Sequence, residues 1–341
     1  MHAKVSIFGC IYHQKIVCNA QVILMNARDL IYALTCSGIV GFACVPAVAG
    51  DGRYVELCKA FGRGYLQLPG SDNCLKFSGI VRGQLDFNLD NASTKEESKS
   101  VLSLSFGSNT SYGKLIGKFS FEAAGNPARS KLNPKFSEGI LALGKYKIGY
   151  SASNWVRYDW GGYNIKSGPF GYHKADMIAF EDTIAGLKLR LAAEYPENTS
   201  QQFPSAIAHL SKKWKWVSVF VSGVIARDED VHVRVVKSGV VFKLDKIRKG
   251  MRLKFQSTFG HDDIGKYLEG ERWDFIAGLS LPITKKLKSN FTFGTSDLFF
   301  EEYSLAVNLV WRPVSRFKII GELSFVEGGD IGGLIRVQRT F

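Results

Sequence analysis

The sequence lacks the features that would mark a helical membrane protein or an enzyme. Beyond the first 50 residues, no apolar run reaches the roughly 18 residues that a transmembrane helix needs. The six histidines are scattered, and no H-E-x-x-H, G-x-S-x-G or P-loop motif is present. We therefore expect no enzyme activity, no cofactor and no metal ion.

The N-terminus carries an export signal rather than part of the fold. Residues 30–45 are apolar but short for a bilayer span, and Pro46-Ala-Val-Ala-Gly50 follows them as a small-residue cleavage pattern. The pattern predicts a secretory signal peptide over residues 25–49, with cleavage after Ala49. We expect translation to start at Met25, and residues 1–24 to be an upstream segment that is untranslated or removed.

Cysteine is scarce in the exported chain, which would retain only Cys58 and Cys74 of the six cysteines. Two cysteines in an exported chain predict one disulfide, which would close an N-terminal segment over residues 50–74. Two free thiols are the alternative. A zinc site is disfavoured because no histidine or second cysteine pair stands at ligand spacing.

The remaining chain has a β composition, with 35 glycines, 24 phenylalanines and 13 tyrosines. From Leu75 to the end, apolar and polar residues alternate with a period of two, which is typical of strands with two different faces. Leu75, Phe77 and Val81 form one such face, opposite Lys76 and Arg82. We count sixteen candidate strands over residues 75–341.

The connections between these strands tend to alternate in length. Long polar connections are expected at residues 90–98, 124–136, 151–173, 196–203, 226–234, 260–271 and 295–302, and short ones at 108–111, 182–186, 282–286 and 312–316. Long loops at one end and tight turns at the other are the pattern of outer-membrane barrels, which close because every backbone amide in lipid needs a partner. The sequence therefore predicts an all-β fold, a transmembrane antiparallel up-and-down β-barrel of about 16 strands.

Several segments resemble alpha-proteobacterial outer-membrane porins. They are Tyr54–Arg82, with its paired cysteines and Pro69-Gly70, Gly139–Tyr150 followed by Trp160-Gly-Gly-Tyr163, Asn308–Val314, and Arg336–Phe341. The resemblance covers residues 50–341 and is strongest at both ends. It implies a 16-stranded general diffusion channel, usually a homotrimer, whose third long loop folds inward into the pore. Phe341 is similar to the terminal signal that the barrel-assembly machinery reads. Ser153-Asn-Trp-Val156 departs from the Ser-Phe-Phe-like residues of the family.

An open barrel of this size would let small hydrophilic solutes and ions diffuse passively through the outer membrane, in contact with lipid and lipopolysaccharide. The alternation predicts pore-lining positions at Lys76, Arg82, Asp86, Lys114, Lys118, Glu122, Lys188, Arg190, Arg252 and Lys254. Because basic residues outnumber acidic ones on this face, we expect a mild anion preference. In the inward loop, Arg157, Asp159 and Lys166 are the candidates for a constriction.

Two other functions fit parts of the sequence. A surface adhesin or structural barrel without an open channel would share the alternation, but bulky apolar residues would then fill its interior. Nucleic-acid binding would use the formal net charge of +13. It is disfavoured because the basic residues alternate along strands rather than gathering in a patch, and because the chain is exported. We expect no nucleic-acid partner.

Overall fold

The structure is a computed structural model that describes residues 3–6, 22–25, 56–126, 131–156, 163–165, 173–196, 203–228, 231–261, 273–296, 303–328 and 331–341. The chain divides into two compact units, Met1–Tyr54 and Val55–Phe341. In the first unit, β1 (Ala3–Ser6) and β2 (Val22–Met25) pair as a two-stranded antiparallel sheet. Apart from Met25, the expected signal peptide lies outside the described residues, so it stays a prediction.

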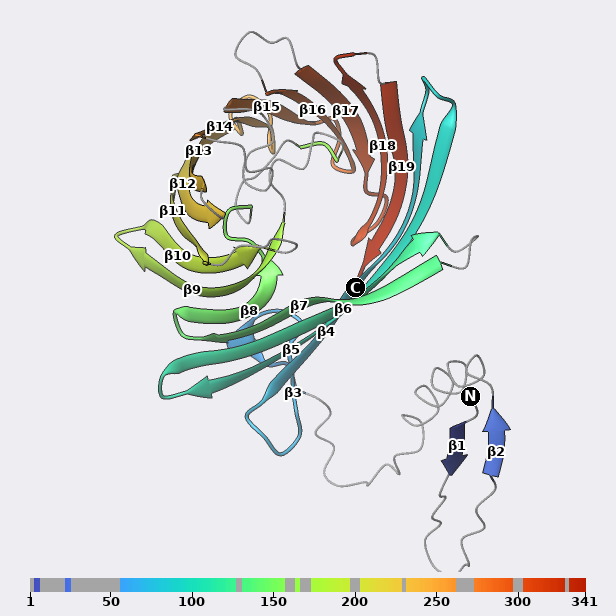
Figure 1. Ribbon diagram of the computed structural model, residues 1–341, viewed down its shortest axis with the longest axis vertical. Helices are drawn as coiled ribbons and strands as arrows, with labels where there is room; N and C mark the ends of the chain where they lie inside the picture. The colour runs from blue at the N-terminus through green and yellow to red at the C-terminus, as the bar shows by residue number, and fades with distance from the viewer. Residues whose placement is uncertain are drawn as a thin grey trace, which may run out of the picture. The chain divides into compact units, whose positions relative to one another are not determined.

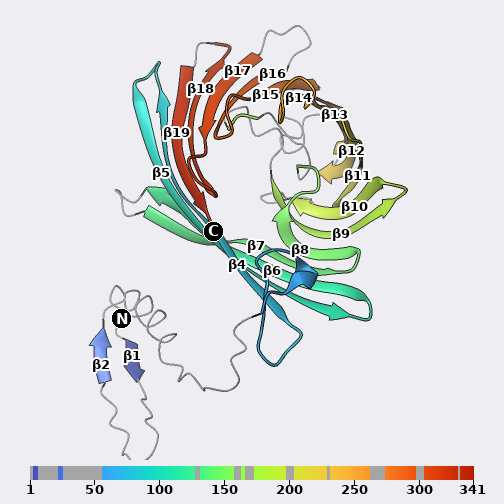
Figure 2. The ribbon, with the colours of Figure 1, turned by 180° about the vertical axis from the view of Figure 1, so that it is seen from behind.

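The second unit is a closed antiparallel barrel in which neighbours in the chain are neighbours in the sheet (Figures 1 and 2). Its wall consists of β4 (Cys74–Asn88), β5 (Ser93–Thr110), β6 (Gly113–Asn126), β7 (Lys131–Leu143), β8 (Tyr146–Ala152), β9 (Lys174–Ile184), β10 (Leu187–Pro196), β11 (Ser205–Lys213), β12 (Val217–Asp228), β13 (Val231–Lys243), β14 (Arg252–His261), β15 (Trp273–Pro282), β16 (Leu287–Thr295), β17 (Tyr303–Trp311), β18 (Phe317–Val326) and β19 (Ile331–Thr340). This confirms the predicted fold class. Within the described residues, no helix has both the length and the apolar character needed to cross a membrane.

The barrel closes where the last strand meets the first. β19 pairs with β4 from Gly332 opposite Asn88 to Thr340 opposite Ile80. At the start of the same edge, Cys74 and Leu75 pair with a two-residue strand, β3 (Leu66–Gln67), from the predicted N-terminal segment. That segment also contains the short 3₁₀ helix η1 (Lys59–Phe61). Part of residues 50–74 therefore belongs to the barrel wall.

Burial along the strands is the reverse of that in a soluble domain. Phe77 and Leu102 are 58% and 52% exposed, while Glu194 and Lys254 are only 0% and 4% exposed. Soluble proteins bury large apolar side chains and leave most charges in water. An apolar outer face with a polar inner face is what a lipid-spanning barrel requires.

One predicted connection is wrong, and several others are shorter than expected. Residues 90–98 are not a long loop, because β5 already begins at Ser93 and its first residues pair with β4. Both faces are polar there, so apolar alternation gives no strand signal. Backbone hydrogen bonds and the ion pair between Arg82 and Glu97 hold this extension in place. β7, β12 and β13 likewise extend into the predicted loops at 124–136 and 226–234.

Candidate functional site in the barrel interior

The inner face of the barrel can be assigned from strand register. Positions that pair across neighbouring strands share a face, and the polar, less exposed set on each strand is also the one that the inward loop contacts. The predicted pore-lining residues all fall on this inner face: Lys76, Arg82, Asp86, Lys114, Lys118, Glu122, Lys188, Arg190, Arg252 and Lys254. Their part in permeation stays a prediction.

Ion pairs link neighbouring strands along β4–β7. Arg82 pairs with Glu97, Lys99 with Glu122 at 2.6 Å, and Lys118 with Glu138. Neither Glu97 nor Lys99 was predicted to line the pore, because Glu97 falls in the connection expected at 90–98 and Lys99 directly follows it. A signal was present, since Glu97 and Lys99 are two residues apart, as expected for one face of a strand. On this part of the wall, three ion pairs therefore neutralise charge locally.

A second charged group lies on β9–β12. Glu181 accepts contacts from both Lys188 and Arg190, and the Arg190 side chain is buried. Beside it, His209 Nδ1 lies 2.7 Å from Ser222 Oγ, and both side chains are buried. One carboxylate therefore contacts two cations on this stretch of wall.

The connection after β8 turns into the barrel, as predicted for the third long loop. Its first described residues are fixed by Glu194 on β10, which accepts hydrogen bonds from Ser153 Oγ, from the Asn154 backbone N–H and from Asn154 Nδ2. The two Asn154 bonds measure 2.8 Å each. All three residues are buried, so few water molecules compete for this carboxylate.

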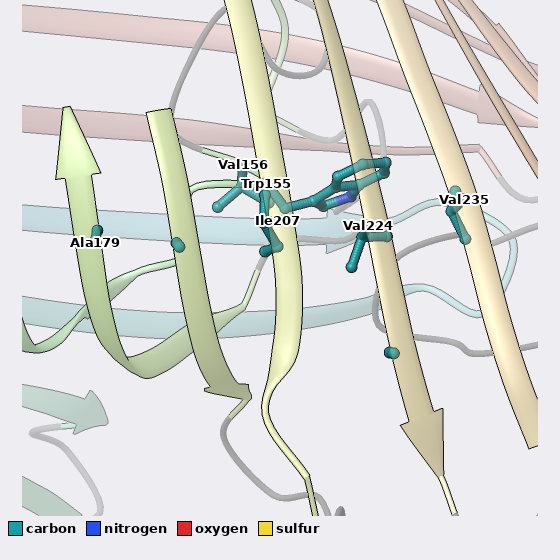
Figure 3. Close-up of a cluster of buried hydrophobic side chains, with 8 residues drawn as sticks. Trp155, Val156, Ala179, Ile207, Val224 and Val235 are labelled. Carbon is teal, nitrogen blue, oxygen red and sulfur yellow. The ribbon is translucent and has the colours of Figure 1, made fainter. Parts of the chain in front are cut away.

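The next two loop residues pack on an apolar stretch of the inner wall. Trp155 and Val156 contact small and branched side chains contributed by β9–β13, namely Ala179, Ala192, Ile207, Val224, Ala226 and Val235. We call these wall residues the apolar seat. Figure 3 shows Trp155 and Val156 beside Ile207 and Val224. Lys237 on β13 donates a hydrogen bond to the Trp155 carbonyl, which links the loop backbone to the barrel wall.

The same loop reaches a second part of the wall. The Tyr163 N–H donates to Thr292 Oγ1 on β16 at 3.1 Å, and the Ile165 N–H donates to Glu322 Oε2 on β18 at 2.8 Å. The loop therefore contacts the wall at β10–β13 and again at β16–β18. The three predicted constriction residues, Arg157, Asp159 and Lys166, lie outside the described residues.

The predicted disulfide joins Cys58 to Cys74 and closes the N-terminal segment. Two of the predicted pore-lining cations contact this segment. Lys114 Nζ donates to the Ala60 carbonyl at 2.5 Å and lies 5.5 Å from the Phe61 ring centroid. Lys76 Nζ lies 5.6 Å from the Tyr65 ring centroid. Because Lys76 and Lys114 are on the inner face, the segment lies against the inside of the barrel near the turn between β5 and β6.

Comparison with known proteins is consistent with this geometry. A family model described as "Porin subfamily" matches residues 44–333. Porin Omp2b of Brucella suis is 23% identical over 336 residues, covering 85% of this chain and 91% of that protein. The putative outer membrane protein y4fJ of Sinorhizobium fredii is 30% identical over 116 residues, covering 30% of this chain and 34% of that protein.

Two solved structures share the fold. The outer membrane channel DcaP of Acinetobacter baumannii aligns with a TM-score of 0.66 at 16% identity, covering 81% of this chain and 99% of that one. A mutant of the Rh. blastica porin aligns with a TM-score of 0.58 at 11% identity, covering 78% of this chain and 100% of that one.

Proposed function

The chain belongs to the porin subfamily and is an outer-membrane porin, and from this premise we propose that its barrel is an open, water-filled passage for passive diffusion of small hydrophilic solutes, with a mild preference for anions. One observation carries the proposal: a closed wall is apolar on the outside, while its inner face is lined with charged side chains. Buried charges are costly without water or a partner, so this interior suits an aqueous channel.

The anion preference follows from how the charges are distributed. Along β4–β7, Arg82, Lys99 and Lys118 each pair with a glutamate. On β9 and β10, Glu181 faces two bases. On β16 and β18, only cations act on Lys288 and Lys318. Positive charge is thus left over on the inner face, and lining charge is one determinant of channel selectivity.

A surface adhesin or closed structural barrel is the alternative function. The apolar seat and Trp155 fill one stretch of the interior with apolar side chains. In a closed barrel, such apolar filling would occupy the whole interior. The charged lining of β4–β7 argues against this extension, since a filled interior would bury those ion pairs at a desolvation cost.

Planar-bilayer recording of the refolded protein tests the proposal. We expect stepwise, ohmic conductance and, in a potassium chloride gradient, a reversal potential displaced toward that of chloride. Well-folded barrels that give no conductance steps would favour the adhesin or structural function. Clear cation selectivity would contradict the anion preference and leave the channel itself intact.

The expected assembly is also a proposal. We propose a homotrimer, delivered to the outer membrane by the barrel-assembly machinery and surrounded there by lipid and lipopolysaccharide. Support comes from the porin family alone. Unheated gel electrophoresis in detergent, with mass determination of the band, would give three times the single-chain mass; a single-chain mass in mild detergent would contradict the trimer.

A further inference from the structure

Four cations form an arc on the inner face of β16–β19, near the short turns. They are Lys288 on β16, Arg312 directly after β17, Lys318 on β18 and Arg336 on β19. Strand register brings them together: Lys288 is opposite Val310, two residues before Arg312, and Arg336 is opposite Ile320, two residues after Lys318. At this spacing like charges repel, and Arg312 acts on both Lys288 and Lys318. We call these four residues the basic arc.

Glu322, Asp86 and Glu97 are within electrostatic reach of Arg336, whereas only cations act on Lys288 and Lys318. Glu322 accepts hydrogen bonds from the Ile165 N–H and from Asn308 Nδ2, each at 2.8 Å. Arg336 Nε donates to the Gln84 side-chain oxygen at 2.7 Å, a neutral partner. Across the described part of the chain, no ion pair joins an acid to any member of the basic arc, although such pairs hold Arg82, Lys99 and Lys118 on the adjoining wall.

The clustering around Lys288 and Lys318 is unfavourable without a counter-charge. Lys288, Lys318 and Arg336 are half-buried against the wall, where the effective dielectric is lower than in bulk water and like charges repel more strongly. A multivalent anion would offset this repulsion at several cations together. Neighbouring strands lie about 4.8 Å apart, so four strands hold the cations over roughly 15 Å. That span fits a chain of phosphate groups better than a single chloride ion.

We propose that the basic arc binds multivalent phosphate-bearing solutes inside the barrel. This inference deepens the proposed function and rests on it, because a solute reaches the arc only through an open interior. Lipid phosphates are unsuitable ligands, since the arc is on the inner face of a closed wall. Guanidinium and ammonium groups are the usual protein ligands of phosphate, and the guanidinium can bind it bidentately.

The position of the arc gives it a place on the permeation route. Glu322, which binds the inward loop, and Lys318 lie on the same strand four residues apart, about 13 Å along the strand. Lys318 is the nearer of the two to the short turn before β18. A phosphorylated solute entering from the long-loop end would therefore pass the loop first and meet the basic arc before the short-turn mouth.

Inorganic tripolyphosphate is the probe. In single-channel recordings of the wild type, we expect it to interrupt the current in a concentration-dependent manner. The double variant Lys288→Gln/Lys318→Gln should raise the half-blocking concentration at least tenfold. The matched control, Lys99→Gln/Lys145→Gln, removes the same number of charges from cations that each pair with an acid, Glu122 and Asp182, and we expect it to change that concentration by less than threefold. Heat-modifiable mobility on gels confirms that each variant folds.

Titration calorimetry of the detergent-solubilised barrel with tripolyphosphate provides an independent readout. Tripolyphosphate binding that is lost only in the arc variant supports the proposal. Equal weakening in both double variants would show a general field effect and overturn it, as would a conducting wild type that neither binds nor is blocked. In that last case the channel function would stand. If the folded protein does not conduct, the proposed function fails, and calorimetry alone decides whether the arc binds.

Discussion

Lys237 and Trp155 join the barrel wall to the inward loop. The Lys237 ammonium donates a hydrogen bond to the Trp155 carbonyl and lies 4.2 Å from the centroid of the indole ring. Lys237 is on β13 and Trp155 is near the start of the loop, and both side chains are fully buried. A cation over an indole face is most stabilising when both are shielded from water. Lys237 therefore holds the loop to the wall by binding both the backbone carbonyl and the indole ring of Trp155.

Replacing Trp155 with alanine should loosen the loop without unfolding the barrel. The change empties the apolar seat, and a Trp-to-Ala change in a packed site costs about 3–5 kcal/mol. We expect larger and noisier single-channel currents, because the first part of the loop no longer packs on the wall. Trp311→Ala is the control, since Trp311 is 47% exposed on the outer face. Unchanged conductance and noise in Trp155→Ala would contradict this role.

Glu194 should be needed to hold the loop start. In Glu194→Ala, three donors from Ser153 and Asn154 lose their acceptor, at about 1–3 kcal/mol for each buried donor left unpaired. We expect trypsin to cleave the loop after Arg157 or Lys166 several-fold faster than in the wild type. Glu194→Gln keeps an acceptor oxygen and should lie between the two. Glu327→Ala, an exposed turn residue, should behave as the wild type. Equal cleavage rates in all four proteins would refute the prediction.

Barrel closure should depend on a glycine opposite the terminal residue. Gly79 and Phe341 exchange backbone hydrogen bonds of 3.1 Å, and a Cβ on Gly79 would lie 2.4 Å from Phe341 Cζ and 2.6 Å from the Val101 carbonyl oxygen. Gly79→Val should therefore lower the yield of folded, heat-modifiable barrel in the outer membrane. Gly83→Val is matched to it, since a Cβ there meets nothing within 4 Å. Similar yields from both variants would contradict a closure role for this contact.

Deleting Phe341 tests the assembly signal separately from closure. Phe341→Tyr keeps an aromatic end and should assemble normally, whereas removal of the residue should leave unfolded chain in the periplasm of the expressing cell. If purified chain lacking Phe341 refolds as efficiently as the wild type in detergent, the loss concerns the assembly machinery. A deletion that assembles normally in cells would show that Phe341 is not the signal.

Strands with uninterrupted alternation could be predicted to the residue. β17 occupies residues 303–311, between the connections predicted at 295–302 and 312–316, and β18 begins at Phe317, directly after the second of them. The start of β5 could not, because Lys95, Glu96 and Glu97 give both faces a polar side chain. The start of β5 is set by pairing with β4, and such tertiary pairing cannot be read from a local sequence pattern.

The loop contacts were harder to foresee than the loop itself. Ile165 and Glu322 are 157 residues apart in sequence, and no local pattern links a backbone N–H to a distant carboxylate. By alternation Glu194 is on the polar face of its strand, like the predicted pore-lining residues, but in the structure it is a buried acceptor for the loop. The apolar pair Trp155-Val156 was the one sequence feature that pointed to a wall contact, since an apolar pair in a pore loop needs an apolar surface to cover it.

Removing the Cys58–Cys74 disulfide should destabilise the N-terminal segment and affect the pore. The two cysteines are 16 residues apart, and closing a loop of about 15 residues contributes roughly 3 kcal/mol in the chain-entropy model. Lys114 and Ala60 keep one contact between segment and wall, so we expect Cys58→Ser/Cys74→Ser to fold with a lower free energy of unfolding in urea. Partial release of the segment should add brief closures to single-channel records, because the segment lies inside the barrel. Reductant should produce both effects in the wild type and none in the double variant. Wild-type stability and quiet currents in the double variant would show that the wall contacts suffice to hold the segment.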